Sequence, residues 1–277
     1  MVLSYVQARP LLDLRPDVPV TTSVSLDLNL TETEVSLTEE GLALPDGQTL
    51  SWNALAAISG DESGCYLIER NGGTRIQFYS ELLDRAYVLY PTLSAPTMLI
   101  SGLPMHRIKD TDPHQDTMEK MQAARPAGRV LDTATGLGYT AIQAAKRADH
   151  VTTIELDPTV VEVCRLNPWS QELFDNAKIT RRMGDAFDVV ETLEDGVFRR
   201  VVHDPPTFSL AGHLYSTGFY QEVFRVLTGS GRLFHYVGDL NSRSGAGVAR
   251  GVRQRLVEAG FRRVEDVPRA FGLLAYK

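Results

Sequence analysis

From residue 129 to residue 277, short apolar segments typical of strands alternate with segments of helical pattern. Parallel strands need a crossover connection, which is usually a helix. The alternation therefore predicts an α/β fold with a parallel, doubly wound sheet and helices on both of its faces. The last two strands follow each other without a helix, which predicts an antiparallel hairpin at the C-terminal edge of a seven-stranded sheet. The predicted strands cover 129–133, 151–156, 178–182, 199–204, 232–237, 261–267 and 272–277.

A glycine turn joins the first of these strands to its helix. The stretch RVLDTATGLGYTA (129–141) places Gly136 and Gly138 between the apolar strand and a good helix-forming segment. Glycines allow close approach of a ligand to the backbone, and the free N–H groups of a helix start favour electronegative groups. The turn lacks the full G-x-G-x-x-G pattern, and Asp132 at its start would repel a pyrophosphate. A cationic ligand suits this turn better.

A second acid, Glu155, ends the next strand, 23 residues after Asp132. This is close to the spacing at which an acid in such folds binds ribose hydroxyls. Hydrogen bonds to a charged group contribute about 1.5–3 kcal/mol, so Glu155 would select free 2′ and 3′ hydroxyls and reject a 2′-phosphate. Hydride cofactors of the NADP type are therefore not expected.

Four segments carry a more specific resemblance: VLDTATGLGYTA (130–141), TIELDP (153–158), GDAF (184–187) and HDPPTF (203–208). In order and spacing they resemble motifs I to IV of the class I S-adenosylmethionine-dependent methyltransferases. Residues 90–277 are also similar to a poorly characterised archaeal group of predicted methyltransferases, which implies no particular substrate. The resemblance implies a Rossmann-like methyltransferase fold and an enzyme that uses S-adenosylmethionine.

The same resemblance implies roles for individual residues. The glycine turn would hold the methionine part of the cofactor, Glu155 the ribose, the segment after the third strand the adenine, and Asp204 with Pro205 would line the reacting methyl group. The implied cofactor-binding residues are Asp132, Thr133, Thr135, Gly136, Gly138, Tyr139, Thr140, Glu155, Leu156, Asp185, Ala186, Asp204 and Pro205.

Asp204 is the leading catalytic candidate. It follows a strand at the carboxyl edge of the predicted sheet, where it faces the ligand crevice and could orient or partly deprotonate an amine. The alternative is a structural aspartate that forms the turn before Pro205 and Pro206. Tyr139 and Tyr215 are further catalytic candidates. Methyl transfer from a sulfonium needs mainly alignment and exclusion of water, so few catalytic groups are expected.

The segment HDPPTF departs from enzymes that methylate nucleobases, in which an aromatic residue directly follows Pro-Pro and stacks on the target. Thr207 occupies that position here, and Phe208 comes one residue later. Together with the net charge of −7, this argues against a nucleic-acid substrate and favours a small molecule. Phe208 and His213 remain candidates for substrate contact, whereas His203 is expected to point into packing.

Other reactions of the same cofactor stay open. The run VTTIELDPTVVEVCR (151–165) also resembles the second motif of spermidine-synthase-type aminopropyltransferases. A related alternative is a cyclase in which the cofactor is itself the substrate and yields azetidine-2-carboxylate and methylthioadenosine. Asp204, Tyr139 or Tyr215 could assist the attacking amine in either case. A nucleic-acid methyltransferase and a protein that binds the cofactor without catalysis are the remaining alternatives.

The N-terminal region, 1–90, is predicted to be a small β-rich domain of structural role. Alternating residues predict strands at 24–30 and 35–37, and further strands are predicted at 65–69, 74–79 and 86–90, with a turn at 71–73. The segment 50–58 is predicted to be a helix capped by Ser51.

Residues 91–128 are predicted to form a proline-rich linker that ends in a helix at 116–124, ahead of the cofactor-binding domain at 129–277. Met105, His106 and Arg107 in this linker are candidates for a lid or a substrate contact.

Composition adds a few expectations. The sequence shows no secretion signal, no apolar run long enough for a membrane span and no metal-ligand spacing, and Cys65 and Cys164 are far apart. We therefore expect a cytoplasmic protein with buried thiols, no metal and no membrane partner. The sequence leaves the oligomeric state open, including a homo-oligomer.

Overall fold

The computed structural model describes residues 1–70 and 72–277. Contacts within the chain divide it into two compact units. Unit 1 consists of Met1–His114 and Thr159–Gln171, and unit 2 of Gln115–Pro158 and Glu172–Lys277. The predicted cofactor-binding domain, 129–277, lies in unit 2 except for Thr159–Gln171, which belongs to unit 1.

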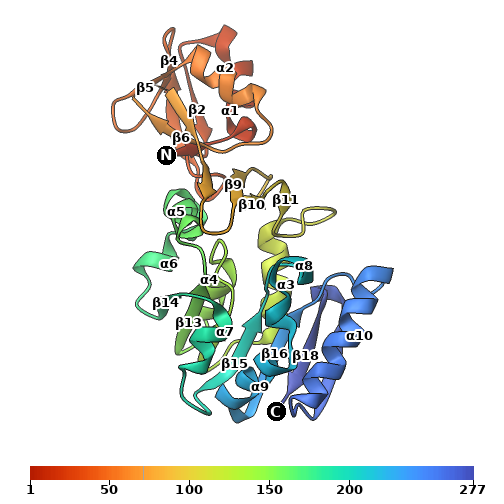
Figure 1. The fold of residues 1–277 in the computed structure, drawn as a ribbon. Coiled ribbons are helices and arrows are strands. Elements are labelled where there is room, and N and C mark those ends of the chain that lie inside the picture. The colour runs from red at the N-terminus through yellow and green to blue at the C-terminus, as the bar shows by residue number, and fades with distance from the viewer. Residues whose placement is uncertain (71) are drawn as a thin grey trace. The chain divides into compact units, whose positions relative to one another are not determined.

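Unit 2 is built on a seven-stranded sheet (Figure 1) with the order β14-β13-β12-β15-β16-β18-β17. The first five strands of this order are parallel to their neighbours, and β18 is antiparallel to both β16 and β17. The predicted mostly parallel sheet with an antiparallel C-terminal hairpin is confirmed. The strands are β12 (Arg129–Asp132), β13 (His150–Glu155), β14 (Ile179–Met183), β15 (Phe198–His203), β16 (Leu227–Tyr236), β17 (Arg263–Val267) and β18 (Gly272–Tyr276).

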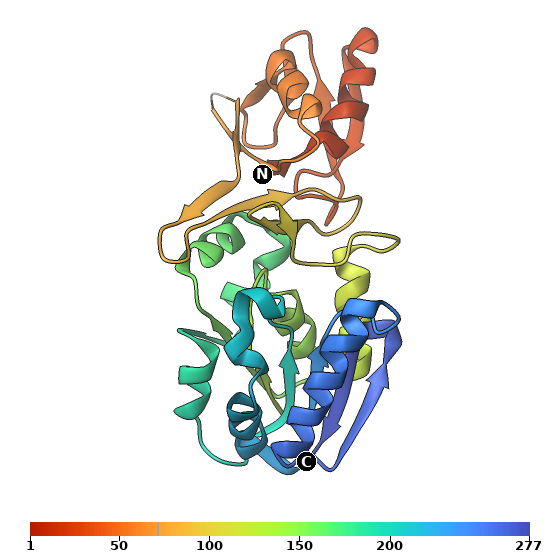
Figure 2. The ribbon, with the colours of Figure 1, turned by 45° about the vertical axis from the view of Figure 1, so that its right-hand side comes forward.

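Helices flank both faces of this sheet (Figure 2), as alternating residues of β18 illustrate. Leu273 and Ala275 pack in a core with Val252 and Leu256 of α10, whereas Leu274 lines a cavity with residues of α3 on the opposite face. Such alternation follows from the period of two in a strand. The helices of unit 2 are α3 (Pro113–Ala124), α4 (Tyr139–Ala145), α6 (Glu172–Asp175), α7 (Ala186–Glu191), α8 (Phe208–Ala211), α9 (Thr217–Val226) and α10 (Arg243–Glu258), with short 3₁₀ turns η3 (Gly212–Tyr215) and η4 (Pro268–Ala270). The helix α5 (Pro158–Leu166) and the 3₁₀ turn η2 (Pro168–Ser170) belong to unit 1.

Unit 1 contains three small antiparallel sheets, with the orders β2-β3-β4-β5, β1-β6-β7 and β11-β10-β9-β8. The predicted small β-rich region is confirmed. Its core joins strand residues such as Leu37 and Leu42 to Leu11 of α1 and Leu55 of α2. The elements are β1 (Val2–Leu3), α1 (Tyr5–Asp13), η1 (Arg15–Asp17), β2 (Val20–Val24), β3 (Thr33–Leu37), β4 (Gly41–Ala43), β5 (Thr49–Ser51), α2 (Trp52–Gly60), β6 (Tyr66–Glu69), β7 (Gly72–Arg75), β8 (Gln77–Ser80), β9 (Arg85–Tyr90), β10 (Thr97–Ile100) and β11 (Leu103–Pro104).

The strand predicted at 24–30 is wrong, because β2 ends at Val24. The Ser25 hydroxyl accepts a hydrogen bond from the Asn29 N–H (2.7 Å), and the Asp27 carboxylate accepts one from the Thr31 N–H (2.9 Å). Leu28 and Asn29 have φ of 56° and 70°, in the left-handed region. Side-chain hydrogen bonds of Ser and Asp therefore form a turn here, in competition with the strand that the apolar alternation predicts.

Other local predictions have mixed outcomes. The capped helix is confirmed, since α2 begins at Trp52 and the Ser51 hydroxyl accepts from the Ala54 N–H at 3.3 Å. The single strand predicted at 74–79 is two strands, β7 and β8, which pair with different partners on either side of the buried Ile76. The predicted linker contains β10, β11 and the predicted helix, which is α3. Asn71 of the predicted turn lies outside the described residues.

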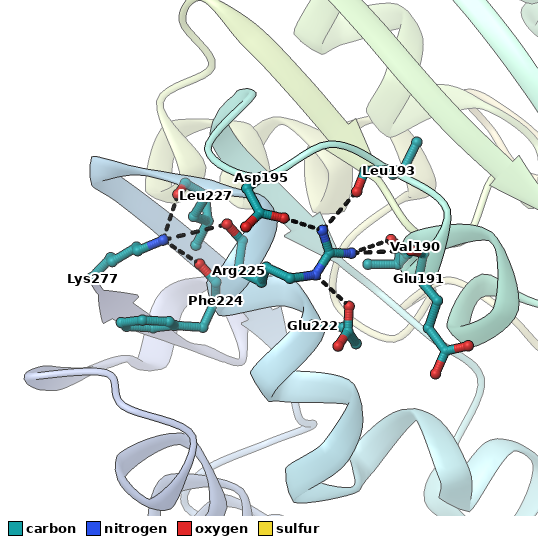
Figure 3. A network of polar contacts seen from close by, with 9 residues as sticks. All are labelled: Val190, Glu191, Leu193, Asp195, Glu222, Phe224, Arg225, Leu227 and Lys277. Atoms are coloured by element: carbon teal, nitrogen blue, oxygen red, sulfur yellow. Dashed lines mark hydrogen bonds and ion pairs between the residues drawn. The ribbon is translucent and has the colours of Figure 1, made fainter.

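At the edge where the parallel strands begin, Arg225 ties α7 to α9 (Figure 3). Its guanidinium donates to the carbonyl oxygens of Val190 (2.9 Å) and Leu193 (2.7 Å) near the end of α7, and to the carboxylates of Asp195 (2.6 Å) and Glu222 (2.7 Å). Cationic side chains stabilise helix C-termini in this way.

We expect Arg225→Ala to lower the free energy of unfolding by about 2–3 kcal/mol, because the partly buried carbonyl oxygens of Val190 and Leu193 lose their donors. Chemical denaturation measures this change, and Arg250→Ala on the exposed surface of α10 is the control. Cofactor affinity should stay unchanged, since Arg225 lies at the opposite edge from the carboxyl ends of the strands. A change in affinity with unchanged stability would contradict this structural role.

Candidate cofactor site

The carboxyl ends of four neighbouring strands bring the predicted acids together in unit 2. Asp132 ends β12, Glu155 ends β13, Asp185 follows β14 and Asp204 follows β15. These strands are parallel and adjacent in the sheet, so their carboxyl ends share one edge. In open α/β sheets this edge is where ligands bind.

The glycine turn between β12 and α4 depends on conformations that only glycine adopts easily. Gly136 and Gly138 have φ of 50° and 79°. A Cβ atom on Gly138 would lie 2.9 Å from the Leu173 side chain. The turn is fastened to both neighbouring strands, because the Thr133 N–H donates to Val202 O (3.1 Å) and the Thr135 N–H donates to Ile154 O (2.8 Å).

Asp132 lies fully buried beneath this turn. Its Oδ2 accepts hydrogen bonds from the hydroxyls of Thr140 (3.1 Å) and Thr153 (2.8 Å). Since Thr153 gives its proton to Asp132, the Thr135 hydroxyl, 2.6 Å away, donates to Thr153. Oδ1 is buried and has no hydrogen-bond partner among the described residues. Burial raises the pKa of Asp132 to about 7, and the carboxylates of Asp204 and Glu155 add to the increase.

Glu155, at the end of β13, accepts hydrogen bonds from backbone N–H groups of the glycine turn and of its own strand end. Its two oxygens accept from the N–H groups of Gly136 (2.9 Å) and Asp157 (3.0 Å). Burial raises its pKa to about 7, against the lowering effect of these hydrogen bonds. A carboxylate offers about four acceptor positions, so both oxygens keep capacity for ribose hydroxyls.

Two large apolar side chains are exposed close to the same edge of the sheet. Leu156, directly after β13, is 38% exposed, and Met183, the last residue of β14, is 50% exposed. Exposed apolar residues at a ligand edge suit a flat base such as adenine. Met183 was not among the predicted contacts, although it directly precedes the GDAF segment.

Asp185 and His213 are brought together at the end of β14. Asp185 caps α7, because its Oδ1 accepts from the Phe187 N–H at 2.8 Å, and its Oδ2 accepts from His213 Nε2 at 2.9 Å. Ala186 is buried as the first residue of α7. Asp185 thus joins the predicted adenine contacts to the η3 segment that carries His213.

Asp204 forms an ion-pair cluster that the sequence analysis missed. The Lys120 ammonium lies 2.6 Å from Asp204 Oδ2 and 2.8 Å from Asp116 Oδ2, and only 2% of the lysine side chain is exposed. The ammonium also lies 4.4 Å from the centre of the Tyr236 ring, within cation–π range. The signal in the sequence was the spacing of four between Asp116 and Lys120, which is common on exposed helix faces and therefore uninformative.

The segment after Asp204 presents an aromatic pair. Phe208 begins α8 and is 53% exposed, and its ring meets the Tyr215 ring edge-on with centroids 5.5 Å apart. The buried Tyr215 hydroxyl donates to Pro206 O at 3.0 Å. Burial, and then the charge of Asp204, raise the pKa of Tyr215 above its usual value, so the phenol stays protonated at neutral pH. Tyr139 is buried as the first residue of α4, and Pro205 is also buried.

His203 is buried in packing, as predicted. A carbonyl oxygen only accepts hydrogen bonds, so the contact of Nε2 with Leu214 O (3.0 Å) places the proton on Nε2. Nδ1 therefore accepts from the Thr133 hydroxyl at 2.6 Å. Burial lowers the pKa of His203 to about 3 and keeps it neutral. It thereby connects the glycine turn to the η3 segment.

Met105, His106 and Arg107 belong to unit 1 and are half-buried. His106 Nδ1 lies 3.0 Å from the hydroxyl of the buried Thr97. Their role as a lid or substrate contact stays a prediction.

Both cysteines are buried and free, as predicted. Among the described residues, no group of His, Cys, Asp and Glu could hold a metal ion. No helix in the described part of the chain has the length and apolar character needed to cross a membrane.

Comparison with known proteins agrees with this geometry. The profile of the family described as Methyltransferase small domain matches residues 114–237. The uncharacterized protein MJ1233 of Methanocaldococcus jannaschii is 43% identical over 262 residues, which cover 92% of this chain and 88% of that protein. The chain belongs to the class I methyltransferase superfamily, in one family with the M. jannaschii protein.

Two solved structures of spermidine synthases are similar to this chain in fold. A spermidine synthase in complex with the transition-state analogue AdoDATO is similar with a TM-score of 0.59 and 15% identity, over 76% of this chain and 78% of that chain. The spermidine synthase of Thermotoga maritima is similar with a TM-score of 0.56 and 16% identity, over 76% and 77%.

Proposed function

We propose that this protein is an S-adenosylmethionine-dependent enzyme that transfers a methyl group to an amine of a small molecule. The observation that carries the proposal is Asp204, which follows β15 at the ligand edge of the sheet with its carboxylate held by the buried Lys120. The two carboxylates and one ammonium of the cluster leave a net charge of −1 at the ligand edge of the sheet.

The cofactor assignment rests on charge and shape. A sulfonium and an ammonium are cations, and both stabilise the ionised forms of Asp132 and Glu155. Burial raises the pKa of each of these two acids to about 7, and a neighbouring cation would favour their ionised forms. Leu156 and Met183 supply apolar surface for the adenine.

Asp204 is suited to orient an amine rather than to act as a strong base, because the Lys120 ammonium already stabilises its negative charge. In the proposed reaction the amine lone pair attacks the methyl carbon, the carbon–sulfur bond breaks and S-adenosylhomocysteine leaves. The amine then loses a proton, which passes to Asp204 or to water. In this proposal Tyr215 stays protonated, donates to Pro206 O and does not serve as a tyrosinate base.

Product analysis tests the reaction. The full chain is incubated with S-adenosylmethionine alone and with a small-molecule extract, and the nucleoside products are separated by chromatography. We expect S-adenosylhomocysteine only when the extract is present. Methylthioadenosine in either incubation would exclude methyl transfer and favour the cyclase or the aminopropyltransferase.

Two matched variants test the site. Asp204→Asn should lower turnover about 100-fold and leave the affinity for S-adenosylhomocysteine within about threefold, because Asp204 is assigned to the acceptor. Glu155→Gln should weaken that affinity at least about tenfold, or about 1.4 kcal/mol, because a charged acceptor of ribose hydroxyls is lost. Calorimetric titration measures both affinities, and the reverse pattern would refute the assignment.

A further inference from the structure

A cavity lies in unit 2, on the face of the sheet that α3 covers. It has a volume of about 420 Å³ and lies between α3, the strands β16, β18 and β17, and η4. Arg232 on its wall precedes the carboxyl end of β16 at Tyr236 by four residues, or about 13 Å of strand. The end of the cavity that Arg232 lines is therefore distant from the edge where Asp132, Glu155 and Asp204 meet.

Three arginines and two glutamates line this cavity, but the glutamates are already engaged. Glu119 pairs with Arg269 at 3.1 Å. Glu265 accepts from the Tyr276 hydroxyl at 3.0 Å and pairs with Arg263 at 3.3 Å. The remaining charge is positive and is carried by Arg125 and Arg232.

Arg232 also faces a like charge. It is the register partner of Arg200 on β15, and like charges directly opposite one another across strands are unfavourable. Burial, followed by the charges of Arg232 and Arg199, lowers the pKa of Arg200 to about 10. In a chain of net charge −7, this concentration of cations is not a consequence of overall composition.

Capping of α3 accounts for only part of the cluster. Arg200 Nε donates to Arg125 O at 3.2 Å, and a terminal nitrogen of Arg232 donates to Ala124 O at 3.1 Å. Arg232 Nε is buried and has no acceptor among the described residues. The Arg125 guanidinium is exposed and makes no hydrogen bond or ion pair that the described structure shows. Two cationic donors thus remain for a ligand.

We propose that this cavity binds a small phosphate monoester with an apolar or aromatic body. Arginine guanidinium groups match phosphate oxygens in geometry, and the charge of a monoester near −2 at pH 7 balances Arg125 and Arg232. Val267, Leu274 and the Tyr276 ring supply apolar surface for the rest of the molecule. The volume is within the range of small-molecule sites.

Calorimetric titration of the full chain with phenyl phosphate tests the proposal. Arg125→Gln and Arg232→Gln should each weaken binding at least tenfold, whereas Arg250→Gln on α10 should leave it unchanged. Benzoate, with the same ring and a single charge, should bind at least tenfold more weakly. Arg232→Gln removes a hydrogen bond to Ala124 O and could impair folding. Arg125→Gln removes no hydrogen bond of the described structure, so it tests binding independently of folding.

Titration in the presence of a saturating concentration of S-adenosylhomocysteine tests whether phenyl phosphate binds in this cavity or at the proposed cofactor site. We expect the affinity for phenyl phosphate to be unchanged by it, whether or not the protein transfers methyl groups. Absence of saturable binding, equal affinity in the two arginine variants and the wild type, or displacement by S-adenosylhomocysteine would each overturn the proposal.

Discussion

Replacing Lys120 by methionine should lower the free energy of unfolding by about 3–5 kcal/mol, because it leaves two carboxylates close together without their cation. Asp116 is fully buried and the Asp204 side chain is only 18% exposed, so water replaces the ammonium only in part. The methionine has a similar length but lacks the ammonium that faces the two carboxylates and the Tyr236 ring. Chemical denaturation at pH 8 measures the change.

Two comparisons make this test specific. Lys146→Met, at an exposed position after α4, should change stability by no more than about 1 kcal/mol. Adding Asp116→Asn to Lys120→Met should recover part of the loss, since one uncompensated carboxylate is removed. A loss below about 1 kcal/mol in Lys120→Met would mean that the two carboxylates do not depend on the lysine.

Replacing Asp132 by asparagine should stabilise the cofactor-free protein at pH 8 and weaken its affinity for S-adenosylmethionine at least about tenfold. The pKa of Asp132 in the folded state is about 7, above the ordinary 3.8. A raised pKa favours the folded state below about pH 4, and this advantage is lost as the pH rises through 7. At pH 8 the folded protein therefore bears the cost of a buried charge, on the order of 2–4 kcal/mol.

Asparagine removes that charge and keeps an oxygen for the hydroxyls of Thr140 and Thr153. The stability gain should shrink as the pH is lowered from 8 to 5, because the wild-type carboxyl becomes protonated in the folded state. Thermal unfolding at several pH values measures the gain, and Asp149→Asn on the exposed surface is the control. A gain that is independent of pH, or a loss at pH 8, would contradict a buried ionisable Asp132.

Most strands of unit 2 were predictable because they are short apolar segments that a helix separates from the next strand. The last two, β17 and β18, were predictable as an antiparallel hairpin because no α-helix lies between them. The same holds for Asp132, Glu155 and Asp204, since a residue at the end of a parallel strand has a defined place at the edge of the sheet. In unit 1 the apolar alternation at Leu26 and Leu28 predicted a strand that does not form, because side-chain hydrogen bonds of Ser25 and Asp27 stabilise a turn there.

The burial of Lys120 could not be predicted from the local sequence pattern. Its helix was predicted, but the spacing from Asp116 to Lys120 is equally typical of an exposed surface pair. Burial of the lysine depends on Asp204, 84 residues later in the chain, and on the ring of Tyr236. Such contacts between distant segments leave no periodic signal in either segment.

By itself, the sequence determined the order of strands and helices in unit 2, the glycine turn and the acids at the ends of the strands, because these follow from local periodicity and strand direction. The environment of those acids became visible only in the folded chain, where Asp132 lies beneath the turn with a raised pKa and Asp204 pairs with Lys120. The same is true of the cavity at which Arg232 lies beside Arg200. The physical reason is that charge and burial depend on which distant side chains share a low-dielectric environment, and this is established only when the sheet and its helices assemble.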